Sequence, residues 1–155
     1  MKYILLIFVL IFSSCSIKNY EQTQTKVIVI KSPKLRFADV GYIRNTSKSI
    51  ELELFTAGQT VEKITINHFI CVSGGCMSKS EFNQDYLNAS YPDDILQNIL
   101  LSEVIYHGKN FVKTTEGFEQ YIEDENIDIV YIITSESIYF KDNKNGILLK
   151  IRNTR

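Results

Sequence analysis

Apolar and polar residues alternate along several stretches of the chain, and this period of two constrains the fold more than any other feature. In residues 50–54, three aliphatic side chains would lie on one face of a strand and two glutamates on the other. Successive side chains of a strand point to opposite faces, so this pattern predicts a strand with one buried face. Apolar runs in residues 27–30, 35–44 and 61–71 extend the prediction of strands over the first half of the chain.

The middle of the chain has a helical pattern instead. Ser78 is followed three residues later by Glu81, the spacing of a capping box at the start of a helix. Pro92 and two aspartates precede an apolar stripe in residues 95–100, which predicts a second helix. The apolar spacing in residues 118–122 predicts a third, shorter helix.

The last part of the chain returns to strands. Residues 127–133 are apolar on both faces, which predicts a strand in the middle of a sheet. Residues 138–140 and 147–151 predict two more strands, joined by a turn at residues 142–146. We therefore predict an α+β fold with antiparallel strands at both ends of the domain and two or three short helices between them.

Nine apolar residues, 4–12, lie close to the N-terminus after Lys2 and before Ser13, Ser14 and Cys15. As a helix they would reach about 14 Å, which is less than the roughly 30 Å hydrocarbon core of a bilayer. A positive residue, a short apolar core and two small residues are typical of a secretory signal peptide.

Residues 12–15 (Phe-Ser-Ser-Cys) resemble the lipobox of bacterial lipoprotein precursors, the substrates of signal peptidase II. In that family the cysteine thiol receives a diacylglyceryl group, the signal is cut off before the cysteine, and the new amine is acylated with a fatty acid such as palmitate. The resemblance implies that Cys15 is lipidated and that its lipids hold the protein on a membrane. Phe12 departs from the family, which usually has Leu at this position. Ser16 replaces the aspartate that retains such proteins in the inner membrane, so in a Gram-negative cell the resemblance implies the outer membrane.

The predicted organisation is a signal peptide (residues 1–14), lipidated Cys15 with a flexible tether (residues 15–26), and one globular domain (residues 27–155). The segment 15–26 is polar and shows no periodicity. The chain has 155 residues, 45% hydrophobic and 23% charged, which suits one domain with its own core. Its net charge is −1 and it has no cluster of arginines, so we expect no nucleic-acid partner.

Cys71 and Cys76 remain as a pair when Cys15 is acylated, in a compartment that favours oxidation. The four residues between them include two glycines, which can close a small loop. We predict a disulfide that contributes about 2 kcal/mol. A redox-active pair, free thiols or a metal site are the alternatives, although thioredoxin-like chemistry uses a Cys-x-x-Cys spacing.

Other polar residues give weaker signals. His68 falls on the apolar face of a predicted strand, and His107 lies in a predicted turn without a partner in sequence. Zinc would need more ligands than these histidines and cysteines offer in one place, so we predict no metal and no cofactor. The acidic run at residues 123–125 is typical of a solvated surface.

Two hypotheses for function follow. The first is a membrane-anchored envelope lipoprotein with a non-enzymatic binding or structural role, whose partner is an envelope protein or cell-wall component. The second is an envelope hydrolase acting on cell-wall or carbohydrate material, with Asp85, Asp93 and Asp94 as the first candidate carboxylates. Residues 76–92 resemble uncharacterised small lipoproteins of the Campylobacter and Helicobacter group, a likeness that implies no activity.

Overall fold

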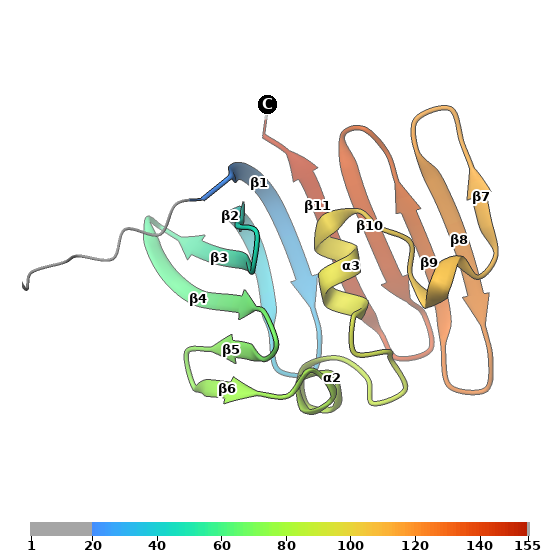
Figure 1. Ribbon diagram of the computed structural model, residues 1–155, viewed down its shortest axis with the longest axis horizontal. Coiled ribbons are helices and arrows are strands. Elements are labelled where there is room, and N and C mark those ends of the chain that lie inside the picture. Colours follow the sequence, from blue (N-terminus) through green and yellow to red (C-terminus); the bar gives the residue numbers. More distant parts are fainter. Residues whose placement is uncertain (1–19, 155) are drawn as a thin grey trace, which may run out of the picture.

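The computed structural model describes residues 20–154. The predicted signal peptide and the lipidation site Cys15 lie outside the described residues. Figure 1 shows two groups of strands with the helices between them in the chain. In chain order the elements are the strands β1 (Gln22–Lys31), β2 (Arg36–Asn45), β3 (Ile50–Thr56), β4 (Gln59–Ile66), β5 (Ile70–Val72) and β6 (Gly75–Met77), the helices α2 (Lys79–Tyr86) and α3 (Ile95–Leu101), the 3-10 turn η2 (Tyr106–Gly108), and the strands β7 (Phe111–Lys113), β8 (Phe118–Glu123), β9 (Asp128–Ile133), β10 (Ser137–Asp142) and β11 (Ile147–Asn153).

The strands form one antiparallel sheet in the order β6-β5-β4-β3-β2-β1-β11-β10-β9-β8-β7. Each half of the chain is a meander in which successive strands pair with each other. The two halves join where β1 pairs with β11, so that Ile28 faces Ile151. The helical segment connects the two outermost strands, β6 and β7, which form the edges of the sheet.

The helices cover one face of this sheet and close its hydrophobic core (Figure 1). Helix α3 packs against β10, and α2 lies beside the turn between β1 and β2, where Asp85 pairs with Lys34. Inward side chains of the strands, such as Leu52 and Ile64, meet Phe82 and Leu96 of the helices. The space left among them is only about 20 Å³, so the core is filled by the chain's own side chains.

The predicted α+β class is wrong. The described residues form a sheet of eleven strands with only two α-helices, so the fold is β-rich. The capping box at Ser78 and Glu81 does start α2, and the stripe after Pro92 does become α3. These helices have eight and seven residues and serve as a cover on the sheet.

The predicted third helix at residues 118–122 is the strand β8. Its buried positions are Gln120 and Ile122, which alternate as strand residues do. The Gln120 side chain is buried because it donates to the carbonyls of Ile105 and Lys109 and accepts from the Ile105 amide. A polar residue on the core face therefore hid the period of two from the sequence pattern.

Strand β1 begins at Gln22, inside the segment 15–26 that the sequence assigns to the tether. Residues 22–25 pair with β2 but are exposed, because this end of the strand extends past the apolar core. Since both faces meet water there, no apolar periodicity marks the strand in the sequence. The ordered domain therefore starts at least five residues earlier than the predicted boundary at residue 27.

Candidate functional site

A cleft of about 160 Å³ lies between the end of α3 and the sheet. It lies where the start of β1, the end of β2, the β9–β10 turn and the end of β11 come together. Its buried aliphatic residues are Ile43, Leu100, Ile138 and Ile151. Its polar residues are mostly amides and hydroxyls: Gln22, Gln24, Asn45, Asn153, Ser102, Thr134, Ser135 and Ser137.

Two charged side chains also line this cleft, one basic and one acidic. Lys26 donates from Nζ to the side-chain oxygen of Asn153 at 2.6 Å. Glu136 is the single carboxylate among the lining residues. The Asn45 Oδ1 atom is buried and has no hydrogen-bond partner in the described structure. A buried acceptor without a donor costs about 1–3 kcal/mol, so a donor that reached this atom would stabilise the structure.

The sequence did not identify these residues, because they come from five separate elements. The only local signal is that Gln22, Gln24 and Lys26 alternate, which puts them on one face of β1. Polar residues in that pattern are common on exposed strands, so the sequence alone does not separate them from ordinary surface.

A charged cluster lies on the opposite face of the sheet, over β2, β3 and β4. Glu51 is 1% exposed and pairs with Arg44 at 3.2 Å and Lys63 at 3.0 Å. Arg44 also pairs with Glu53. Burial alone would raise the pKa of Glu53, but hydrogen bonds from Arg44 and Thr60 outweigh it and hold the pKa below its ordinary value. The cluster joins three strands through paired charges and has the character of a structural network.

Tyr20 is attached to this cluster from the start of the described chain. Its hydroxyl donates to Glu51 Oε1 at 2.9 Å. The guanidinium of Arg44 lies 5.4 Å from the centre of the Tyr20 ring and 4.8 Å from that of Tyr42. These contacts fix the backbone of the chain immediately before β1.

A second polar group is fully buried between the helical segment and the sheet. The hydroxyl of Tyr91, in the loop between α2 and α3, donates to Asp142 Oδ2 at 2.7 Å. Burial would raise the pKa of Asp142, but hydrogen bonds from Asn145 and Tyr91 and from backbone amides lower it overall. Burial is also the main reason why the pKa of Tyr91 is raised. This pair has no access to solvent and is structural.

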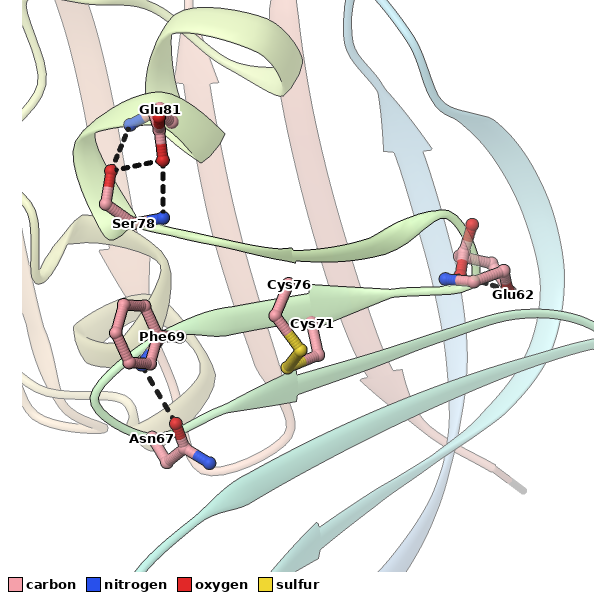
Figure 2. Close-up of a disulfide and its surroundings, with 8 residues drawn as sticks. Glu62, Asn67, Phe69, Cys71, Cys76, Ser78 and Glu81 are labelled. Carbon is pink, nitrogen blue, oxygen red and sulfur yellow. Dashed lines mark hydrogen bonds between the residues drawn. A yellow bond between two sulfur atoms is a disulfide. The ribbon is translucent and has the colours of Figure 1, made fainter.

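The predicted disulfide is present. Cys71 of β5 faces Cys76 of β6, and the bridge joins them with a Cα–Cα distance of 3.9 Å (Figure 2). The loop expected between the cysteines is the tight turn of a β-hairpin, which ends directly before the Ser78 capping box. At the far side of this hairpin, Ser73 donates to Glu62 of β4 through its amide and hydroxyl. The bridge therefore closes the edge hairpin of the sheet.

The remaining candidates do not come together. His68 was expected on the apolar face of a strand, but it lies exposed in the turn between β4 and β5. His107 lies in η2 in a left-handed conformation and is exposed. Asp94 precedes α3 and accepts from the Asn98 side chain, and Asp93 is exposed. Within residues 20–154, no three His, Cys, Asp or Glu side chains group as they would around a metal ion.

None of the helices among residues 20–154 is long and apolar enough to cross a membrane. Comparisons with protein-family models, with curated proteins and with solved structures found no match.

Proposed function

We propose that this chain is a lipid-anchored, non-enzymatic binding protein of the bacterial cell envelope. The observation that supports this best is the cleft beside α3, which is lined mostly by neutral amides and hydroxyls and includes Asn45, whose Oδ1 has no donor within the described residues. The lipid anchor at Cys15 rests on the lipobox, and Ser16 favours the outer membrane over the inner.

The ligand that suits this cleft is small, neutral and rich in hydroxyl groups. Amides and hydroxyls offer both donors and acceptors, which match the hydroxyls of a sugar. Lys26 and Glu136 are the two charged residues of the lining, and their opposite charges leave it with no net charge to select an anion. The volume of about 160 Å³ is below the roughly 300–1,000 Å³ of pockets that enclose drug-sized ligands. One sugar ring or the end of a longer glycan is the appropriate size.

The chemistry of the cleft favours binding over hydrolysis. Glycoside hydrolysis generally uses two carboxyl groups about 5–9.5 Å apart. Glu136 is the one carboxylate among the residues that line this cleft. Asp85 pairs with Lys34, and neither Asp85, Asp93 nor Asp94 lines the cleft.

Titration followed by NMR of the full mature chain in detergent micelles tests this proposal. The side-chain amide signals of Gln22, Gln24 and Asn45 report directly on the cleft. We expect N-acetylglucosamine at millimolar concentration to shift them, and glucose 6-phosphate, an anionic sugar, to shift them less. Asn45→Ala should remove the response, while Asn143→Ala, at an exposed turn between β10 and β11, should keep it. Cleft signals that stay in place with both sugars would reject a hydroxyl-rich ligand.

A further inference from the structure

One end of the sheet is defined by a row of paired residues. Gln22 of β1 faces Asn45 of β2, Asn45 faces Ile50 of β3, and Ile50 faces Ile66 of β4. We refer to this row and the turns beyond it as the Gln22 end. Neighbouring strands are about 4.8 Å apart, so the row measures about 14 Å from Gln22 to Ile66. The β2–β3 turn (residues 46–49) and the β4–β5 turn (residues 67–69) both project beyond it.

The chain reaches the sheet at this same end. The Glu21 amide donates to the carbonyl of Asn45, and Tyr20 is held by Glu51 and Arg44. Cys15 precedes Tyr20 by five residues, a length that spans at most about 17 Å. Lipids on Cys15 would therefore keep Tyr20, where the chain enters the Gln22 end, within about 17 Å of the bilayer surface. The turn of Phe69 lies one row of about 14 Å away, so it can reach the same surface when this end of the sheet faces the bilayer.

Phe69 stands on the β4–β5 turn of the Gln22 end, and its side chain is 56% exposed. That is the largest exposure among the large hydrophobic residues of the described chain. Two hydrogen bonds hold this turn. The side-chain oxygen of Asn67 accepts from the Phe69 amide (Figure 2), and the Asn67 backbone amide donates to the Phe69 carbonyl. The chain thus holds an aromatic ring in water on a rigid turn.

We propose that the Gln22 end rests on the bilayer in which Cys15 is anchored, with the ring of Phe69 in the interfacial region. Aromatic rings are favoured at the boundary between headgroups and acyl chains, where apolar area leaves water. Lys48 on the neighbouring β2–β3 turn is exposed and makes no ion pair with the described residues, so it can face anionic headgroups. This inference rests on the lipid anchor of the proposed function. It adds a defined orientation, in which the cleft lined by Gln22 and Asn45 opens beside the membrane surface.

Tryptophan fluorescence tests this orientation cleanly, because the chain contains no tryptophan. The full lipidated chain would be placed on vesicles of phosphatidylethanolamine and phosphatidylglycerol. One variant is Phe69→Trp. The matched control is Phe111→Trp, since Phe111 is 46% exposed but lies on β7, at the far edge of the sheet from β4 and β5.

We expect the Phe69→Trp emission to shift to the blue on vesicles and to lose intensity when the lipids carry bromine near the headgroup. The Phe111→Trp emission should keep its wavelength and intensity. Flotation with the vesicles measures the anchor separately. If both variants float and Phe69→Trp is quenched no more than Phe111→Trp, the docking is wrong while the anchor stands. If neither floats, the lipid anchor itself is wrong, and the docking with it.

Discussion

The hydrogen bond between Tyr91 and Asp142 joins the helical segment to the sheet, and Tyr91→Phe removes it with little change in shape. Tyr91 is buried and its ring packs edge-on against Phe140 at 5.9 Å, contacts that phenylalanine keeps. A hydrogen bond to a charged group contributes about 1.5–3 kcal/mol. Asp142 retains donors from Asn145 and from backbone amides, so the carboxylate is not left unpaired. We therefore expect a loss near the lower limit, about 1.5 kcal/mol.

The pH dependence of this loss follows from Asp142. Its pKa in the folded state lies below the ordinary value of 3.8. A group with a lowered folded pKa stabilises the fold above its unfolded pKa, and this stability disappears as the pH falls through the folded pKa. The cost of Tyr91→Phe should thus be complete at pH 7. It should shrink in strong acid, where the remaining bond joins two neutral groups and contributes about 0.5–1.5 kcal/mol.

Urea unfolding at pH 7, and at the lowest pH where the fold survives, measures the two free energies, and thermal unfolding at pH 7 measures the shift in midpoint. Tyr139→Phe on β10 is the control, because the Tyr139 hydroxyl has no hydrogen bond within the described residues. At neutral pH we expect the midpoint of thermal unfolding to fall by about 6 °C for Tyr91→Phe, at about 4 °C per kcal/mol. It should change by less than about 2 °C for Tyr139→Phe. Equal effects of the two substitutions, or a Tyr91→Phe cost that grows in acid, would refute this account of the buried pair.

Two further perturbations test the sheet. Replacing both Cys71 and Cys76 with serine should lower the free energy of unfolding by about 2 kcal/mol and leave the domain folded, because the closed loop is short; global unfolding of this variant would contradict a local role. Gly117→Ala should destabilise by about 3 kcal/mol or more, since its Cβ would lie 2.2 Å from the carbonyl oxygen of Ile133. Gly74→Ala is its control, with nothing within 4 Å of the added atom, and denaturant unfolding that ranks the two equally would contradict the packing.

The sequence predicted elements whose signals are local. The alternation in residues 50–54 is β3, and the three runs near the end of the chain are β9, β10 and β11. The capping box predicted where α2 starts, because its two hydrogen bonds lie within four residues. The disulfide was predicted because two cysteines remain once Cys15 carries lipid, and because two glycines between them allow the chain to turn.

The remaining features depend on contacts between distant residues. The pairing of β1 with β11 joins the two ends of the domain, and no local pattern specifies it. Gln120 occupies a core position of β8 because the carbonyls of Ile105 and Lys109 satisfy its amide, which made a strand look helical. The cleft could not be predicted from the sequence for the same reason. Asn45 and Asn153 are far apart in the chain and line the same cleft only after the sheet has formed.

We propose that lipids on Cys15 hold this protein on a membrane, and labelling with radioactive palmitate tests this most directly. The wild-type chain should incorporate the label and sediment with the outer membrane. Cys15→Ala should lose the label, because in the lipobox family both the diacylglyceryl group and the amine-linked fatty acid are attached to this cysteine. A Cys15→Ala variant labelled as strongly as the wild type would contradict the account.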